Sequence, residues 1–329
     1  MPILPSIEAL PADRPLAVTV GVFDGLHRGH LDVLRTAAEA ARERDAASTV
    51  ITFEPHPAAV LRGAAPCLLT DPAERLERIA AAGIDLVVLQ RFDLAFSKQS
   101  AEAFVERIAA GRDLRALVMS PESAFGKDRA GTIDAMRRLA GERSFDVIEC
   151  AERDSGGSRI SSGRIRSLVG EGRLATAARL LGRRYAVVGT VVRGDQRGRT
   201  LGYPTANFAF DEPVCLPPDG IYAVRIGWGG GSVLVPTYRA DGVASLGVRP
   251  TFGVGARVLE VHLFDFDGDL YGRRMRVEFV RRQRGERRFA GVDELVRQMD
   301  LDCIRARAIL AAAPRVLPRN RTPDRLPRS

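Results

Sequence analysis

The sequence predicts an α/β domain with a parallel sheet, followed by a small antiparallel β-barrel. In the first half, short apolar runs rich in Val, Ile and Leu alternate with stretches of helical spacing, as in a doubly wound parallel sheet. From Tyr185 onward, strand-like runs follow one another through Gly- and Pro-rich turns, which favours a closed or nearly closed barrel. A chain of 329 residues is long enough for two such domains.

The strands expected in the first half are continuous apolar runs, as buried parallel strands require. They are Ala17–Phe23, Ser48–Phe53, Leu86–Leu89, Ala116–Met119 and Val147–Cys150. Helices are expected between and after them at Leu31–Arg44, Pro72–Ala82, Ala101–Ala110, Ser162–Val169 and Leu174–Leu181. Asp71 followed by Pro72 predicts the start of the second helix, because Asp caps a helix and Pro suits its first position.

The second half is expected to consist of short strands and one closing helix. The strands are Ala186–Val192, Ile221–Ile226, Ser232–Pro236, Gly242–Leu246, Val258–Phe266 and Arg276–Val280, and the helix is Val292–Leu310. From Pro314 onward the chain is rich in Pro and Arg without an apolar face, which predicts a disordered tail. We therefore expect domains at 1–183 and 184–312 and a tail at 313–329.

The charge balance raises the question of a nucleic-acid partner. The chain carries 49 basic and 41 acidic residues, for a formal net charge of +8. However, no helical stretch concentrates the arginines, and aromatic residues make up 6% of the chain, so stacking platforms are sparse. A basic nucleic-acid-binding protein is the alternative from another class, and we expect no specific nucleic acid.

The remaining composition predicts a cytoplasmic protein without a membrane partner, present as a monomer or a weak homo-oligomer. No apolar run reaches the ~18 residues that a membrane helix needs, and the N-terminus lacks the apolar core of a signal peptide. The four cysteines lie far apart with no CxxC spacing, which favours neither a zinc ribbon nor a disulfide-stapled secreted scaffold. Each is expected to be a small buried apolar residue.

The strongest local signal is the segment GVFDGLHRGH at residues 21–30, directly after the first expected strand. A glycine turn at the carboxyl end of such a strand is where α/β sheets bind ligands, and the free N–H groups of a helix start favour phosphate. His27 and His30 are three residues apart, so both can face one phosphate chain; the alternative is two surface histidines. The candidate phosphate-binding residues here are Gly21, Phe23, Asp24, Gly29, His27 and His30.

A second cationic element is expected at residues 159–166, which read RISSGRIR. Serines at a helix start offer hydroxyls and free N–H groups, and arginines bind phosphate through two parallel hydrogen bonds. The candidates are Ser161, Ser162, Arg164 and Arg166. The alternative is a capped helix with surface arginines.

The second half carries a glycine-rich strand–loop–strand segment at residues 189–207. Backbone amides of such a loop can cradle phosphates, although a loop of this kind alone is often only a turn. The candidate ATP- and phosphate-binding residues are Gly194, Arg197, Gly198, Arg199, Gly202 and Pro204. Thr205 and Asn207 follow with hard oxygens suited to Mg²⁺ that is shared with nucleotide phosphates.

The first half resembles the N-terminal half of bacterial bifunctional riboflavin kinase/FMN adenylyltransferases, the FAD synthetases. The resemblance rests on GxFDGxHxGH, on TFEPHP at residues 52–57 and on ISSxxIR. It implies a Rossmann-like nucleotidyltransferase fold and transfer of AMP from Mg·ATP to FMN. His27 and His30 would then bind ATP phosphates as catalytic residues, and Ser161, Ser162 and Arg166 would close on the triphosphate, helped by Arg164.

Four positions depart from that family pattern. Val22 stands where Asn is usual, Glu122 and Ser123 replace residues of the fourth-strand motif, and Thr132 replaces an acid. A lost aromatic face and an added negative charge predict a slow, altered or lost adenylyltransferase. The alternative function is therefore a riboflavin kinase with a degenerate or repurposed first domain.

The second half resembles the riboflavin kinase domain over nearly all of 185–310. The matching segments are PTAN at 204–207 and residues 220–222, 244–253, 260–272 and 284–289. The resemblance implies a small β-barrel and γ-phosphoryl transfer from Mg·ATP to the ribityl 5′-hydroxyl of riboflavin. It places the catalytic base at Glu260, Mg²⁺ at Thr205 and Asn207, and a phosphate- or flavin-side arginine at Arg284. His262 is expected to be a packed or capped histidine. The partners implied are riboflavin, FMN and ATP, with Mg²⁺ accompanying ATP and flavin as substrate and product.

Overall fold

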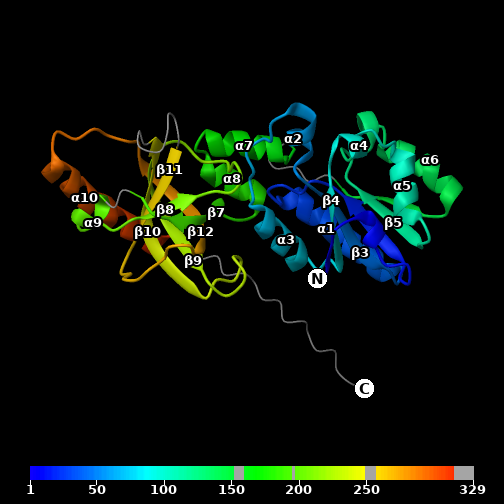
Figure 1. Cartoon of the computed structure of the whole chain (residues 1–329), viewed down its shortest axis with the longest axis horizontal. Coiled ribbons are helices and arrows are strands. Elements are labelled where there is room, and N and C mark those ends of the chain that lie inside the picture. The colour runs from blue at the N-terminus through cyan, green and yellow to red at the C-terminus, as the bar shows by residue number, and fades with distance from the viewer. Residues whose placement is uncertain (152–158, 195–196, 249–256, 315–329) are drawn as a thin grey trace, which may run out of the picture. The chain divides into compact units, whose positions relative to one another are not determined.

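The computed structural model describes residues 1–151, 159–194, 197–248 and 257–314 (Figure 1). The side chains of Arg197 and Arg199 lie outside the described part. The chain forms two compact units. One comprises residues 1–189 together with 210–218, and the other comprises 190–209 and the chain from 219 onward.

The first unit is built on a six-stranded sheet with strand order β1-β4-β3-β2-β5-β6. All neighbouring strands run parallel. The strands are β1 (Ile3–Leu4), β2 (Leu16–Val20), β3 (Ala47–Glu54), β4 (Leu86–Arg91), β5 (Leu114–Met119) and β6 (Asp146–Glu149). The chain leaves central β2 for β3 on one side and later returns to β5 on the other. This reversal makes the carboxyl end of β2 a topological switch point, where α/β sheets bind ligands.

Helices cover both faces of this sheet (Figure 1). They are α1 (Arg28–Glu43), α2 (Pro57–Arg62), α3 (Pro72–Ala81), α4 (Leu94–Ser97), α5 (Ala101–Ala109), α6 (Ile133–Arg143), α7 (Ser162–Gly170) and α8 (Leu174–Leu181), with short 3₁₀ turns η1 (Ile7–Ala9) and η2 (Lys127–Arg129). Consecutive strand residues enter opposite cores: Ile51 packs with Phe104 of α5, whereas Val50 packs with Leu34 of α1 and Ile79 of α3. The central strands are mostly apolar because both of their faces are buried.

Helix starts follow the capping chemistry of the sequence. The Asp71 carboxylate accepts from the amides of Ala73 at 2.9 Å and Glu74 at 3.0 Å, with Pro72 at the first helical position. The predicted helix beginning at Pro72 is therefore confirmed. The preceding predicted helix begins three residues earlier than Leu31, at Arg28, because the His27 side chain caps it.

The second unit is a closed barrel with strand order β10-β11-β8-β7-β12-β9, as predicted. Its strands are β7 (Ala186–Val192), β8 (Ala206–Ala209), β9 (Gly220–Trp228), β10 (Tyr238–Val248), β11 (Arg257–Leu263) and β12 (Arg274–Arg284), and α9 (Arg197–Thr200) lies in the β7–β8 loop. The final helix α10 (Val292–Ala312) packs Ala306 and Leu310 against Ala223 and Phe264 of the barrel.

Several expectations about elements were wrong or incomplete. Ser232–Pro236 is not a strand but lies in the β9–β10 connection, where Gly229, Gly230 and Gly231 have φ angles of 77°, 83° and 72°. Three successive left-handed residues turn the chain out of the extended conformation that a strand requires. β8 and α6 were not predicted as elements of their own. β8 was missed because it spans four residues inside a Gly-rich segment.

The expectation for the cysteines was also wrong for two of them. Cys67 and Cys215 form a disulfide, with their Cα atoms 4.8 Å apart. The pairing arises because residues 210–218, although they follow β8, pack in the first unit. The Leu68 amide donates to the Pro213 carbonyl at 2.7 Å, and the Cys215 amide to the Leu68 carbonyl at 2.9 Å. The two cysteines are 148 residues apart in sequence, so their spacing did not predict this pairing.

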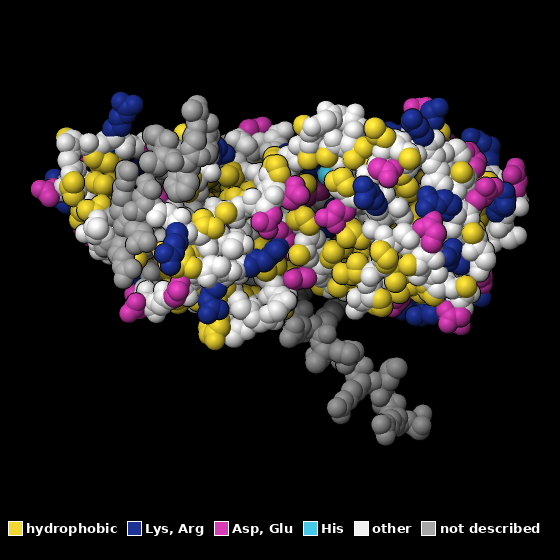
Figure 2. All heavy atoms as spheres, viewed as in Figure 1, with side chains coloured by type: hydrophobic (Ala, Val, Ile, Leu, Met, Phe, Trp, Pro, Cys, Tyr) yellow, Lys and Arg dark blue, Asp and Glu magenta, His cyan; other side chains and the backbone are white. Residues whose placement is uncertain are grey.

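Within the described residues, no helix has the length and apolarity needed to cross a bilayer. On the face drawn in Figure 2, Lys and Arg side chains are interspersed with Asp and Glu and do not gather in one patch.

Candidate functional sites

The connection from β2 to α1 is a tight turn that contains three residues with positive φ. Phe23 has a φ of 53°, Gly25 of 85° and Leu26 of 30°. A Cβ on Gly25 would approach the Leu69 side chain to 2.9 Å, so glycine is required there by both conformation and space. The turn places His27 at the N-cap of α1, at the carboxyl edge of the sheet.

His27 and His30 form one unit at this helix start. The Nδ1 of His27 accepts a hydrogen bond from the His30 amide at 3.2 Å, and the two rings stack with centroids 3.6 Å apart. Phe23 meets the His30 ring edge-on at 5.3 Å. Among the described residues, the buried Nδ1 of His30 has no hydrogen-bond partner. A buried ring nitrogen of this kind is one that a bound ligand can satisfy.

Both imidazoles are neutral at pH 7. Burial, and then the positive charge of Arg183, lower the pKa of His27 to about 4. The pKa of His30 lies well below its ordinary value, again through burial and then through His27 and Arg183. Neutral histidines can donate a ring N–H to a phosphate oxygen without paying for a buried charge beforehand.

The lowered pKa of His27 predicts that acid destabilises the first unit. The unfolded chain takes up this proton near pH 6.5 and the folded chain only near pH 4. The stability is therefore present above pH 6.5 and is lost as the pH falls toward 4, by up to about 3 kcal/mol. We expect denaturant unfolding to show this loss. His27→Asn keeps a capping oxygen but does not titrate, so it should lose less stability; equal losses in both proteins would contradict the assignment.

The start of α7 lies against the β2–α1 turn. Ser161 caps α7 by accepting from the Arg164 amide at 3.3 Å, and the Ser162 hydroxyl donates to the Asp24 carbonyl at 2.8 Å. The Arg166 guanidinium lies 2.6 Å from the Asp24 carboxylate. The structure thus brings together the HxGH and ISSxxIR segments, which are more than a hundred residues apart in sequence.

Asp24 positions its neighbours. Its side chain is buried, at 3% exposure, and accepts from the Leu69 and Thr70 amides at 3.0 and 3.1 Å in addition to Arg166. A carboxylate with these partners has little capacity left for a further ligand. Arg166 is held at its other side by the Cys67 carbonyl, at 2.9 Å from Nε.

Two further arginines contact the same turn, and neither was predicted from the sequence. Arg183, just after α8, donates to the carbonyls of Gly25 at 2.7 Å and Leu26 at 3.0 Å. Arg75 of α3 is buried and donates to the Val22 carbonyl at 3.3 Å, and burial lowers its pKa. Neither arginine lies in a motif, and in a chain with so many arginines nothing else marks a single one as a site residue. Together with Arg166 they give the turn three guanidinium groups.

The residues that depart from the family pattern have local roles. The Glu122 carboxylate lies 2.7 Å from the Arg159 guanidinium, so its negative charge is paired. The Ser123 hydroxyl accepts from the Ser120 amide at 3.0 Å and closes the turn after β5. Thr132 caps α6, and the Val22 side chain packs against the core.

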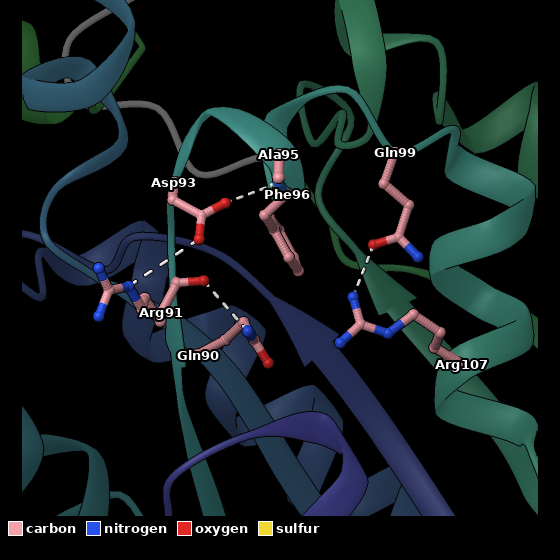
Figure 3. Close-up of a pocket in the computed structure, with 7 residues that line it drawn as sticks. All are labelled: Gln90, Arg91, Asp93, Ala95, Phe96, Gln99 and Arg107. Carbon is pink, nitrogen blue, oxygen red and sulfur yellow. Dashed lines mark hydrogen bonds and ion pairs between the residues drawn. The ribbon is translucent and has the colours of Figure 1, made fainter.

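A cavity of about 390 Å³ opens at the carboxyl end of β4 (Figure 3). It is lined by Gln90, Arg91, Asp93, Ala95, Phe96, Gln99 and Arg107. The Arg107 guanidinium lies 5.6 Å from the Phe96 ring centroid and donates to the Gln99 side chain at 2.9 Å. Strands β4 and β2 are separated by β3 alone, or about 10 Å, so this cavity lies on the same sheet edge as the histidine pair.

The barrel site is centred on a cross-strand pair, Asn207 of β8 opposite Glu260 of β11. Asn207 is 4% exposed, and its buried Oδ1 has no hydrogen-bond partner among the described residues. A Cβ on Gly194 would lie 2.5 Å from the Asn207 amide, so only glycine leaves room for that side chain. Thr205 lies two residues before Asn207, half-buried.

The loop ahead of β8 is folded tightly on itself. The Tyr203 amide donates to the Gly198 carbonyl at 2.8 Å, and a Cβ on Gly198 would lie 2.3 Å from the Tyr203 carbonyl oxygen. Gly202 has a φ of 85°. His262 Nδ1 lies 2.8 Å from the Pro204 carbonyl, just beyond the last β8–β11 pair at Val261. His262 therefore holds the PTAN segment, consistent with a packed or capped histidine.

Arg284 is engaged with α10. Its Nε lies 3.0 Å from one Asp302 oxygen and its Nη2 2.6 Å from the other, and Asp302 is 3% exposed. Gln298 donates to the same carboxylate at 3.0 Å. The structure thus joins Asn207 and Glu260 directly and ties Arg284 to the last helix of the same unit.

The fold and the two sites define a class: an HxGH-type α/β nucleotidyltransferase domain joined to a riboflavin kinase-like barrel. Residues 10–164 match the family model for FAD synthetase, and residues 181–310 match the model for riboflavin kinase. The bifunctional riboflavin kinase/FMN adenylyltransferase of Escherichia coli K12 is 38% identical over 88% of this chain and 91% of its own length. The protein of that name from Bacillus subtilis 168 is 34% identical over 87% and 89%.

A solved structure described as a macrolide-efflux protein from Streptococcus pneumoniae has the same fold. It is 30% identical, covers 91% of this chain and 96% of its own, and has a TM-score of 0.79. From the full-length relatives, the chain belongs to the bifunctional riboflavin kinase/FMN adenylyltransferase family.

Proposed function

We propose that this protein phosphorylates riboflavin to FMN with ATP and then transfers AMP from a second ATP to FMN, giving FAD and pyrophosphate. The observation that supports this most is that one chain carries both sites, each with the residues of its motif held together in the fold. The relatives that carry both activities in their names match along nine-tenths of their length.

The two reactions belong to separate parts of the chain. We assign FMN adenylylation to a domain at 1–183 and riboflavin phosphorylation to a domain at 184–312. The compact units differ from these bounds chiefly in residues 210–218, which pack in the first unit. The tail at 313–329 is assigned to neither reaction.

In the kinase reaction, the riboflavin 5′-hydroxyl attacks the γ-phosphorus of ATP. Glu260 accepts the hydroxyl proton as general base, and Asn207 faces it across the strand pair. The unsatisfied oxygen of Asn207, the space left by Gly194 and the neighbouring Thr205 hydroxyl fit Mg²⁺. Bound Mg²⁺ would neutralise charge on the phosphate oxygens. The glycine-rich loop supplies amides for the phosphates, and Arg284, held by Asp302, supports its flavin or phosphate side.

In the adenylyl transfer, an FMN phosphate oxygen attacks the α-phosphorus of ATP and pyrophosphate leaves. No covalent intermediate on the protein is required, so positioning and charge stabilisation carry the rate. His27 and His30 donate ring N–H groups, while Ser161, Ser162 and Arg166 bind the triphosphate and Arg164 assists. The Phe96-lined cavity on the same sheet edge is large enough for the flavin rings.

The kinase-only alternative is not favoured. Its motivation was the negative charge of Glu122 and the loss of an aromatic side chain at Ser123. Arg159 pairs with that charge, and the FAD synthetase model spans residues 10–164, which include both positions. Purified protein given FMN and Mg·ATP should form FAD at a steady rate. Absence of FAD in this assay, with FMN formed from riboflavin, would restore the kinase-only function.

We place the protein in the cytoplasm, where ATP and flavins are available, as a monomer or weak homo-oligomer. Its proposed partners are riboflavin, FMN and ATP with Mg²⁺, without a membrane or a specific nucleic acid. Size-exclusion chromatography with light scattering gives the oligomeric state.

A further inference from the structure

The disulfide includes Cys67, which contacts Arg166 of the proposed triphosphate site. Cys67 is in the segment between α2 and α3, and Cys215 is in the 210–218 segment of the same unit. The Cys67 carbonyl accepts from Arg166 Nε at 2.9 Å. Cys67 therefore takes part in the disulfide through its sulfur and holds one side of Arg166 through its backbone carbonyl.

The chain just after Cys67 holds the other side of Arg166. The amides of Leu69 and Thr70 donate to the Asp24 carboxylate, and that carboxylate pairs with Arg166 Nη2 at 2.6 Å. Residues 67–70 therefore contact Arg166 directly and through Asp24. A movement of residues 67–70 would therefore displace both groups that hold the Arg166 guanidinium, the Cys67 carbonyl and the Asp24 carboxylate.

The second cysteine is anchored independently of the bond. The Tyr185 hydroxyl donates to the Cys215 carbonyl at 2.5 Å, and the Cys215 amide donates to Leu68. Tyr185 is fully buried, and burial raises its pKa, which keeps the hydroxyl protonated as a donor. Reduction therefore leaves Cys215 close to Cys67 and ready to bond again.

The two cysteine residues differ in exposure. Cys215 is 4% exposed, whereas Cys67 is half-buried. An incoming thiolate can therefore reach Cys67 more readily than Cys215. The other two cysteines form no bond: Cys150 is buried, and Cys303 lies on α10.

We propose that Cys67 and Cys215 form a reversible thiol–disulfide site through which low-molecular-weight thiols and disulfides adjust ATP binding by the adenylyltransferase. The inference rests on the proposed function. In reduction, a small thiolate attacks the Cys67 sulfur and the Cys215 thiolate leaves. A second thiolate then attacks the mixed disulfide and releases Cys67, so two small thiols become one small disulfide. Oxidation reverses these steps with the small disulfide as oxidant.

Reduction is expected to change the KM for ATP in FAD formation and not in FMN formation. Reduction leaves residues 67–70 held by hydrogen bonds alone. Arg166 should then sample other positions more often, so the KM for ATP in FAD formation should rise about five- to tenfold, with a smaller change in kcat. FMN formation should stay within about twofold, because Asn207 and Glu260 are held by the barrel ladder.

The test compares wild-type protein equilibrated in oxidised or reduced glutathione with the variants Cys67→Ser, Cys215→Ser and the double variant. Alkylation under denaturing conditions, read by mass spectrometry, counts free thiols: two are expected in the oxidised wild type and four after reduction. Calorimetric titration with a non-hydrolysable ATP analogue gives binding apart from turnover. The single and double variants should match the reduced wild type and should not respond to glutathione.

Cys303→Ser is the matched control and should behave as wild type. Four free thiols in the oxidised protein would overturn the proposal, as would one KM for ATP in both redox states. Failure of the proposed function is distinguishable, because FAD would then be absent in both redox states while the thiol count still reports the bond.

Discussion

Glu260→Gln is expected to abolish FMN formation, with kcat reduced about 10²- to 10⁴-fold. Gln keeps the size and the hydrogen-bonding capacity of the side chain but cannot accept the riboflavin proton. Because Glu260 pairs with Asn207 across β11 and β8, the substitution should leave the barrel ladder intact. The measurement is steady-state FMN formation from riboflavin and Mg·ATP, with thermal melting as the check on folding.

Two controls make the Glu260 result specific. Glu278→Gln changes another strand carboxylate of the barrel, one paired with Arg276 at 3.3 Å, and should retain most of the kinase activity. The Glu260→Gln protein supplied with FMN should still make FAD. If it retained more than a few per cent of kinase turnover, Glu260 would not be the base.

His30→Ala is expected to lower kcat/KM for FAD formation about 10²- to 10³-fold. The reason is that removing one preorganised donor from a charge-stabilising site costs about that much. His30 carries the buried nitrogen without a partner and stacks on His27, so the substitution removes a donor and leaves His27 without its ring neighbour. FAD formation from FMN and Mg·ATP is the measurement.

The same protein provides the control for His30. FMN formation from riboflavin should be unchanged, because it takes place on the barrel. His30→Asn, which restores an N–H donor of similar reach, should recover part of the loss. A His30→Ala protein with more than a third of the wild-type kcat/KM would remove His30 from phosphate binding.

Local chemistry made the order of elements predictable. Asp71 before Pro72 marked a helix start, and uninterrupted apolar runs marked strands buried on both faces. Glu260 and His262 were correctly expected in one strand. These signals depend on residues that are close in sequence, so they can be interpreted without knowing the tertiary contacts. The contrasting case is Ser232–Pro236, where an apolar run was outweighed by the glycine turn before it.

The candidate sites were predictable in their motifs but not in their contacts. The motifs pointed to His27, Asp24 and Arg166, but not to the contacts of Asp24 with two amides and Arg166. Arg75 and Arg183 come from elements that only the folded sheet edge brings together. The Cys67–Cys215 bond depends on where residues 210–218 pack, which no spacing rule encodes.

A time course from riboflavin tests the central claim most directly. Purified protein is incubated with riboflavin and excess Mg·ATP, and riboflavin, FMN and FAD are separated by chromatography at successive times. We predict that FMN appears first and then declines as FAD accumulates. The Glu260→Gln protein should give neither product from riboflavin, and the His30→Ala protein should stop at FMN. Wild-type protein that forms no FMN, or that leaves FMN as the final product, would contradict the account.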